Sequence, residues 1–321
     1  MSDETVSLDV LESRVRRRED RREFFRAIGG MAAVGGVVTA MSSAAQAQAT
    51  APTDADILNF ALNLEYLEAQ FYLFAVNGQG LPSGSLSGTG TRGEATGGRQ
   101  VTFTDPVVAQ YAREIAADER AHVDFLRTAL GGAAVAQPAI DISAGATGPF
   151  SNAARAAGLI GAGQSFDPYA NDENFLLGAF IFEDVGVTAY KGASPLLTNL
   201  DTLEAAAGLL AVEAYHAAIV RTTLFRKGIQ TPSSGLIEAT ESISNARDSL
   251  DGTSNLDQGI RPVATRFGEG SNIFPSDADG LAFSRSAGQV LNIVYLNRMA
   301  VTMGGFFPAG VNGTIRTSAA N

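Results

Sequence analysis

Four stretches of the chain repeat apolar residues at intervals of three and four positions, which is the spacing of a helix with one buried face. They cover about residues 53–78, 105–131, 171–191 and 201–227. Residues suited to cap a helix stand near their starts, and glycine stands near their ends. A connection of about forty weakly patterned residues, 131–171, separates the second stretch from the third. The pattern predicts two helical hairpins joined by one long crossover.

Beyond residue 228 the apolar pattern becomes shorter and weaker. Residues 232–250 predict one amphipathic helix that ends at Gly252, and residues 282–301 predict another. The last glycine-rich stretch, 304–313, reads as a tight tail anchored by phenylalanine. We therefore expect an all-α protein with a four-helix bundle over residues 53–228. Residues 229–321 would form a C-terminal helical extension packed on this bundle.

Two carboxylates lie on helix faces that are otherwise apolar. Glu65 shares its face with Leu62 and Ala69, and Glu183 shares its face with Ala179. An ionised carboxylate in such surroundings is costly unless it is paired or binds a cation. These two acids are therefore candidates for a buried polar site.

The only two histidines of the chain each follow a glutamate by three positions. The pairs are Glu119 with His122 and Glu213 with His216. On a helix this spacing places the carboxylate and the imidazole on one face. A single pair of this kind is usually solvated, but the repetition in two separate helices indicates a shared site.

The two halves of the bundle repeat one order of polar residues. Each half has a glutamate, a tyrosine seven positions later, and then Glu-x-x-His on the next helix. The residues are Glu65, Tyr72, Glu119 and His122 in the first half, and Glu183, Tyr190, Glu213 and His216 in the second. This order matches the ligand plan of di-metal four-helix bundles. On these motifs the chain resembles the ferritin-like superfamily.

Further motifs narrow the resemblance to the desiccation-related, ferritin-like group of bacteria and plants. They are NLEYLEA at 63–69, LNIVY at 291–295, GGFFP at 304–308 and GVNG at 310–313. The resemblance covers roughly residues 53–313. It implies a ferritin-like up-down bundle with one long crossover, and a role in stress or desiccation protection. The metal motifs are shared by many ferritin-like enzymes, so they do not specify the reaction.

The composition limits which metals such a site would hold. The chain has no cysteine, so every ligand must be an oxygen or an imidazole nitrogen. Two divalent cations would neutralise four buried glutamates, and these donors suit iron or manganese. Zinc would also bind, but it would not change its oxidation state and so would not support a redox reaction.

The family pattern implies a role for each of the six candidate ligands. Glu119 and Glu213 would bridge or chelate both ions. Glu65 and Glu183 would cap one ion each, and His122 and His216 would bind one ion each.

Five neighbouring polar residues receive structural interpretations. We interpret Tyr72 and Tyr190 as core aromatics rather than as partners of a ligand carboxylate. We interpret Glu68 as a residue at the surface or beside the site rather than as an additional metal ligand. Asp118 and Asp184 are expected to face outward or to orient a ligating histidine.

The N-terminal residues 1–49 read as an export signal. Arg21-Arg22 precedes an apolar run over 27–40, and small A-x-A residues follow, which allow cleavage after Ala47 or Ala49. This segment resembles the twin-arginine signals of bacteria, although Asp20 stands where Ser or Thr is usual. It implies the twin-arginine export machinery as a partner and a periplasmic or extracellular location. The run is too short for a stable membrane span, and no span is expected to remain after cleavage.

Charge and length exclude some classes of function and leave two open. The formal net charge of −11, without a basic cluster in the body of the chain, argues against nucleic-acid binding. An extension of about ninety residues would obstruct a ferritin cage, whereas a smaller homo-oligomer stays open. The chain is then either a di-iron or di-manganese oxidoreductase acting on oxygen or peroxide, or a non-catalytic metal-binding or structural stress protein.

Overall fold

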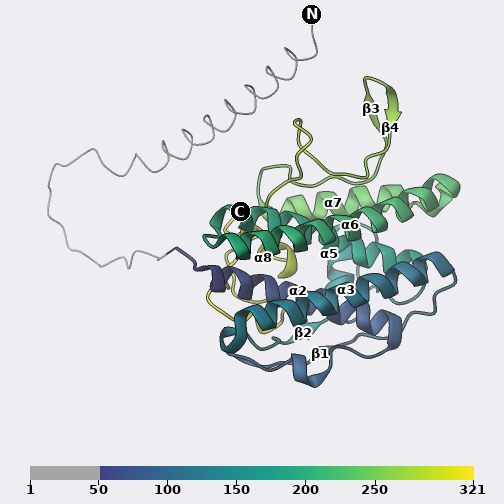
Figure 1. Cartoon of the computed structure of the whole chain (residues 1–321). Helices are drawn as coiled ribbons and strands as arrows, with labels where there is room; N and C mark the ends of the chain where they lie inside the picture. Colours follow the sequence, from purple (N-terminus) through teal and green to yellow (C-terminus); the bar gives the residue numbers. More distant parts are fainter. Residues whose placement is uncertain (1–50) are drawn as a thin grey trace, which may run out of the picture. The chain divides into compact units, whose positions relative to one another are not determined.

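Four long helices form the body of the molecule in a computed structural model that describes residues 51–321. They are α2 (Asp54–Asn77), α3 (Pro106–Leu130), α5 (Asp172–Ala193) and α6 (Leu200–Gln230). Helix α2 packs along α3 and α5 packs along α6, while α2 also contacts α5 and α3 contacts α6 (Figure 1). The predicted all-α four-helix bundle is thus confirmed. The export signal expected over residues 1–49 lies outside the described residues.

Local capping chemistry sets where these helices begin. The Thr53 side chain accepts a hydrogen bond from the backbone of Asp56, whose carboxylate bonds back to Thr53, and this reciprocal pair forms a capping box. The side chains of Asp105 and Asn199 accept hydrogen bonds from backbone N–H groups at the starts of α3 and α6, without the reciprocal bond of a capping box. Gly78 ends α2 in the left-handed conformation, with φ of 74°, which costs glycine little.

Helix α6 continues to Gln230, two residues past Gly228, which was expected to end it. A Cβ atom at Gly228 would lie 2.8 Å from a side-chain carbon of Ile237, so the glycine permits close packing against the next helix. Among the described residues, α6 alone is long and apolar enough to cross a membrane by length and composition. It nevertheless packs along α5 and buries Glu213 and His216 in the bundle.

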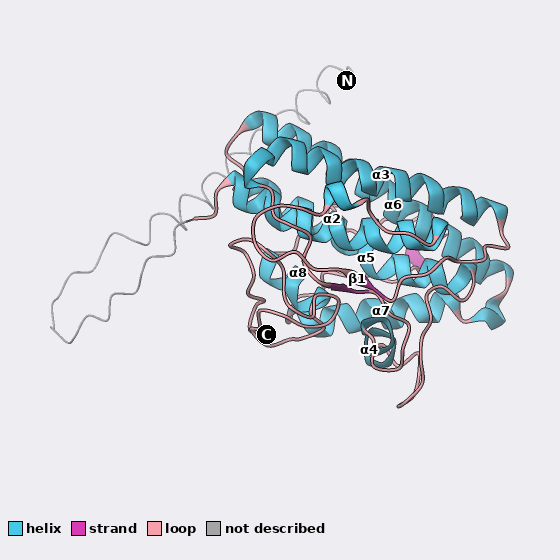
Figure 2. Cartoon of the chain, turned by 90° about the horizontal axis from the view of Figure 1, so that it is seen from below, coloured by secondary structure: helices cyan, strands magenta, loops and turns pink. Residues whose placement is uncertain are grey.

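The crossover between the hairpins is more ordered than its sequence pattern suggests. It contains β2 (Ile140–Asp141), which pairs in parallel with β1 (Ala95–Thr96), and the short helix α4 (Pro149–Ala156). Phe150 on α4 packs on Phe71 of α2, with ring centroids 5.5 Å apart. The crossover therefore packs against the bundle through α4, which lies at the lower edge of the view in Figure 2.

The C-terminal extension contains α7 (Leu236–Asp251), the hairpin of β3 (Val263–Thr265) with β4 (Gly268–Gly270), and α8 (Ala287–Val294). The sequence predicted a helix over residues 282–301, but the observed helix α8 is shorter at both ends. A capping box of Ser286 with Gln289 starts α8, and Leu296 with φ of 53° turns the chain out of it.

Hydrogen bonds tie the C-terminal tail to the first helix of the bundle. The Asn312 backbone exchanges two hydrogen bonds of 2.9 Å with the Asn63 side chain, two residues before Glu65. The Asn312 side-chain amide also donates to the carbonyl of Ala136 in the crossover.

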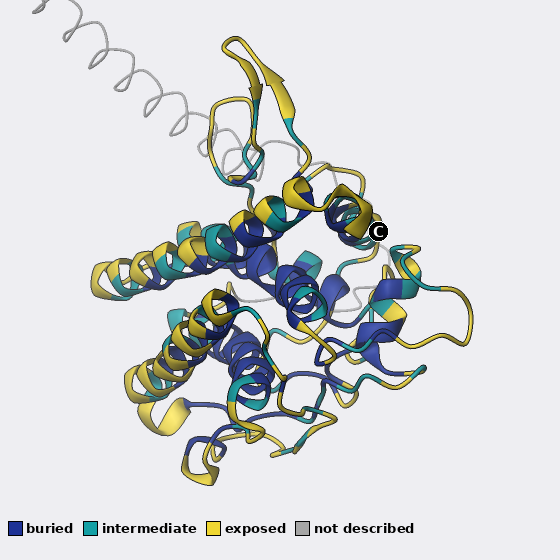
Figure 3. Ribbon diagram, turned by 90° about the vertical axis from the view of Figure 1, so that its right-hand side faces the viewer, coloured by how far each residue is buried: buried dark blue, intermediate teal, exposed yellow. Residues whose placement is uncertain are grey.

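Buried residues face the interior of the bundle and exposed residues face outward (Figure 3). The candidate site consequently lies in a closed, water-poor interior.

Candidate metal centre

All six candidate ligands meet in the middle of the bundle. They are Glu65 on α2, Glu119 and His122 on α3, Glu183 on α5, and Glu213 and His216 on α6. Each is buried, with at most 6% of its surface exposed. The helical periodicity places these residues on the inner faces, and the hairpins bring the inner faces together.

The first group forms around His122. Its Nδ1 atom lies 3.1 Å from Oε2 of Glu65, 3.5 Å from Oε1 of Glu213 and 3.8 Å from Oε2 of Glu119. The ligand atoms of these four residues all lie within 4.8 Å of one another. One imidazole and three carboxylates from three helices therefore surround one small volume.

The second group forms around His216 and mirrors the first. Its Nδ1 atom lies 3.0 Å from Oε1 of Glu119 and 3.7 Å from Oε2 of Glu183. With Glu213 these residues make a second group whose ligand atoms lie within 4.8 Å of one another. Glu119 and Glu213 belong to both groups, and the two imidazole centroids are 6.0 Å apart. This is the arrangement of two neighbouring sites that share two carboxylates.

Several atoms of the cluster are buried without a hydrogen-bond partner among the described residues. They are both carboxylate oxygens of Glu119 and of Glu213, Oε2 of Glu183, and Nδ1 of His216. The 3.0 Å approach of His216 Nδ1 to Glu119 is therefore not a hydrogen bond. Unsatisfied buried polar atoms are costly and rare, whereas ligand atoms that converge on a cation look like this. The residues present fit a bound metal.

The electrostatics of the cluster also favour cations. Burial, aided by the charge of Glu119, raises the pKa of Glu65 to about 8, and burial raises the pKa values of Glu183 and Glu213 as well. Burial opposes ionisation of Glu119 too, but the two neighbouring imidazoles lower its pKa to about 2. Burial therefore opposes the charge of most of these carboxylates, and a cation bound among them would stabilise their ionised form and displace protons from the cluster.

Tyr72 and Tyr190 are partners of the cluster, so their interpretation as core aromatics alone was wrong. The Tyr72 hydroxyl donates to Glu183, and the Tyr190 hydroxyl donates to Glu65. Each tyrosine thus holds a glutamate of the other hairpin. The repeated seven-residue spacing was a signal for this pairing, but only the packing of α2 against α5 brings the partners together.

Asp118 orients an imidazole, which is one of the two alternatives expected for it. Its Oδ2 atom lies 3.1 Å from Nε2 of His216, and this contact leaves Nδ1 of the same ring directed into the cluster. A carboxylate on the outer nitrogen fixes the ring and its tautomer and makes the inner nitrogen more basic. Asp118 therefore supports the site from outside it.

Glu68 is buried, with 5% of its surface exposed, so its placement at the surface was wrong and its placement beside the site was right. Burial, followed by the charge of Glu213, raises its pKa well above the usual value. It does not belong to either four-residue group. Helix α2 is buried on all sides around Glu68, and apolar neighbours such as Leu64 and Leu67 were the available sequence signal for burial.

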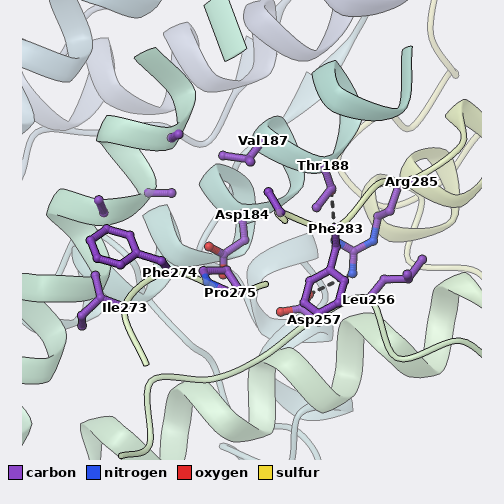
Figure 4. Close-up of a pocket in the computed structure, with 14 residues that line it drawn as sticks. Asp184, Val187, Thr188, Leu256, Asp257, Ile273, Phe274, Pro275, Phe283 and Arg285 are labelled. Atoms are coloured by element: carbon purple, nitrogen blue, oxygen red, sulfur yellow. Dashed lines mark hydrogen bonds and ion pairs between the residues drawn. The ribbon is translucent and has the colours of Figure 1, made fainter. Parts of the chain in front are cut away.

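Asp184 neither faces outward nor orients a histidine, contrary to expectation. It pairs with Arg221 and Arg247 at 2.9 Å, and both guanidinium groups are buried. Arg285 extends this network, donating to Asp257 and to Thr188 (Figure 4). The network joins α5, α6 and the C-terminal extension. A cavity of about 100 Å³ lies beside it, but none of the cluster ligands lines that cavity.

The bundle and its paired Glu and Glu-x-x-His groups define a ferritin-like carboxylate protein. The family model for the ferritin-like domain matches residues 53–226, more than half of the chain, so the chain belongs to this family. Two relatives extend the similarity into the C-terminal part. No solved structure gives a significant match.

The first relative is the ferritin-like catalase Nec2 of Nesocodon mauritianus, which is 30% identical over 272 residues. This alignment covers 82% of the present chain and 84% of the relative. The second is the desiccation-related protein PCC13-62 of Craterostigma plantagineum, 30% identical over 267 residues, covering 81% and 83%. The predicted membership in the desiccation-related, ferritin-like group is confirmed, and the buried cluster fits a metal-binding stress protein.

Proposed function

We propose that the chain is an exported di-metal carboxylate protein that holds two iron or manganese ions and consumes hydrogen peroxide. The observation that carries the proposal is the pair of four-residue groups that share Glu119 and Glu213. These two carboxylates would bind both ions. Glu65 with His122 would complete one site, and Glu183 with His216 would complete the other. The name of one relative as a ferritin-like catalase supports peroxide as the substrate.

Two bound redox-active ions would supply the electron relay between peroxide molecules. The chain itself positions and shields the site. Tyr72 and Tyr190 restrain Glu183 and Glu65 by donating hydrogen bonds across the bundle. Asp118 holds the ring of His216. The buried apolar residues around the cluster exclude bulk water, which strengthens the electrostatic interactions within it.

The test begins with metal content, measured by plasma mass spectrometry after loading with iron or with manganese. The proposal expects two ions per chain and evolution of oxygen from peroxide in an oxygen-electrode assay. Glu119→Gln should lose at least one ion and most of the activity. Glu114→Gln, an exposed glutamate on the same helix, is the matched control and should lose neither. Two ions retained in Glu119→Gln would refute the ligand assignment.

A second candidate is a non-catalytic metal-binding stress protein, which the similarity to a desiccation-related protein favours. In that case metal would stabilise the bundle without turnover. Fully loaded protein that evolves no oxygen from peroxide, yet unfolds at a lower temperature once a chelator removes the metal, would select this candidate.

The proposal of export rests on the sequence of residues 1–49. Fractionation of cells that express the full chain should find it, shortened by 47 or 49 residues, in the periplasm or the medium. Replacing Arg21 and Arg22 together by lysine should retain the protein in the cytoplasm. Export of that double variant at the normal level would exclude the twin-arginine machinery as the partner.

A further inference from the structure

Glu68 makes no hydrogen bond within residues 51–321, and its carboxyl oxygens, unlike those of Glu119 and Glu213, are not fully enclosed but face open space inside the bundle, where 5% of the residue's surface is exposed. A carboxyl group in apolar surroundings is costly unless it meets a hydrogen-bonding partner, whereas a leucine of similar size carries no such cost. The six candidate ligands do not explain this carboxyl group, because it stands outside both four-residue groups. Glu68 therefore requires a function of its own.

Two small apolar cavities meet at Glu68. The outer cavity lies between α2, α5 and α6, and the inner cavity lies between α2, α5 and α8. Both are lined by Leu64, Glu68 and Gly186. Glu68 is the only charged residue in either lining. Its carboxyl group thus occupies the junction of two spaces that are otherwise walled by hydrocarbon and aromatic side chains.

No candidate ligand lines either cavity, but the outer cavity reaches a residue that contacts one. Half-buried Leu58 and Ala193 line it on the solvent side, and Tyr190, which donates to Glu65, lines it on the cluster side. A Cβ atom placed on Gly186 would lie 2.3 Å from Oε2 of Glu213 and 3.6 Å from Oε1 of Glu68. The absence of a side chain at Gly186 therefore leaves room for the carboxyl groups of Glu68 and Glu213 to approach the same point of α5.

The size and polarity of the cavities define what would pass through them. Each has a volume of about 20 Å³, and a cavity needs about 10–15 Å³ to hold one water molecule. Molecules with several heavy atoms do not fit, and charged molecules would be desolvated by the apolar walls. A small uncharged molecule that forms hydrogen bonds would fit and would satisfy Glu68.

We propose that the two cavities form a passage for hydrogen peroxide toward the metal centre, and that Glu68, at their junction, binds the peroxide by hydrogen bonding. This rests on the proposed function for the identity of the substrate. The passage itself rests on the cavities and on the unpartnered carboxyl group. Glu68 then acts on the substrate and not as a ligand of either ion.

Xenon tests the passage without reference to activity, because it occupies apolar cavities of this kind. Crystals under xenon pressure should show the gas in both cavities of the wild-type protein. Ala189→Leu should fill the outer cavity, which Ala189 lines, and abolish only that xenon site. Val187→Leu is the control, since Val187 lies two residues earlier on α5 and lines neither cavity. Absence of xenon from either wild-type cavity would overturn the passage.

Kinetics with the metal-loaded protein test the route. Ala189→Leu should lower kcat/KM for peroxide at least fivefold, while Val187→Leu should leave it unchanged. If the xenon site disappears but kcat/KM does not fall, peroxide does not enter by this route and the proposal fails.

Two variants of similar shape separate the role of Glu68 from mere packing. Glu68→Leu removes the hydrogen-bonding group and should raise KM for peroxide about tenfold, as expected for one lost hydrogen bond, with a smaller change in kcat. Glu68→Gln keeps a hydrogen-bonding group and should restore KM to within about threefold of wild type. Both should retain full metal content. An unchanged KM in Glu68→Leu, or loss of metal from both variants, would overturn the role.

A wild-type protein that binds metal but consumes no peroxide would refute the proposed function and not the passage. In that case crystals of the zinc-loaded protein, soaked in hydrogen peroxide, show whether Glu68 binds peroxide in the passage. A peroxide molecule within hydrogen-bond distance of the Glu68 carboxyl group, together with xenon in both cavities, would support the passage. Empty density beside Glu68 would overturn it.

Discussion

Gly186 provides a direct test of the candidate metal centre, because it is the point where a single methyl group would reach the cluster. A Cβ atom there would lie 2.3 Å from Oε2 of Glu213, and ordinary contacts of this kind are at 3.4 Å or more. In Gly186→Ala the Glu213 carboxylate must therefore move by about 1 Å. The backbone does not need to move, since the clashing atom is the far end of a flexible side chain.

The fold should accept this substitution while the metal site should not. Alanine is favoured over glycine in a helix by about 1 kcal/mol, which offsets much of the local strain in the metal-free protein. Each ligand of a cation must hold its distance within about 0.2 Å, so a displacement of about 1 Å breaks a bond to the metal. We expect metal affinity to fall by at least about a hundredfold, which corresponds to about 2.7 kcal/mol.

The matched control is Gly208→Ala on α6. This glycine is exposed, and a Cβ atom there would meet nothing within 4 Å. Gly208→Ala should therefore stabilise the protein by about 0.5–1 kcal/mol and leave metal binding unchanged. Urea unfolding of the metal-free proteins measures the first quantity, and titration against a competing chelator measures the second. Wild-type affinity and stoichiometry in Gly186→Ala would show that Glu213 does not bind metal in this arrangement.

Three further predictions concern stability. Removing the metal with a chelator should lower the melting temperature, because a ligand present at a thousand times its Kd stabilises the folded state by about 4 kcal/mol. An unchanged melting temperature would show that metal does not stabilise the fold. Arg247→Met should destabilise the fold by about 3–5 kcal/mol in urea, since it leaves the buried Asp184 carboxylate with one partner fewer, whereas Arg226→Met at the exposed pair with Asp105 should cost at most about 1 kcal/mol. Burial raises the pKa of Asp248 to about 6 from the usual 3.8, so the folded state holds this proton more tightly and loses that stability as the pH rises from about 4 to 6. The carboxylate is only half-buried, and solvent screening reduces the corresponding free energy of about 3 kcal/mol to roughly 1 kcal/mol. Asp248→Asn should accordingly be more stable than wild type at pH 8 and equal to it near pH 3, and equal stabilities at pH 8 would contradict the reasoning.

Helical spacing predicted the four bundle helices, and the repeated order of polar residues, matched to the ligand plan of di-metal bundles, predicted the convergence of the six candidate ligands. Helical periodicity specifies which side chains share a face, and the short connection between α5 and α6 requires these two helices to pack as neighbours. The same argument fails for short elements. Helix α4 spans eight residues, 149–156, too few for a periodic pattern to stand out from the crossover around it. The excess length predicted for α8 has a similar cause, since apolar residues continue past Tyr295 where the backbone turns.

The polar residues around the cluster were harder to place, because their roles depend on which helices face each other. Asp118 and Asp184 each stand beside a cluster residue in sequence, yet one reaches the histidine of another helix and the other binds two buried arginines. The difference arises because Asp184 faces the C-terminal extension, which supplies Arg247 from α7. A Glu-x-x-His pattern is thus complete within one helix and can be predicted from spacing. A residue that supports the site, such as Asp118, acts across the bundle on a side chain of another helix. Asp184 contacts Arg247 only because the extension packs against α5.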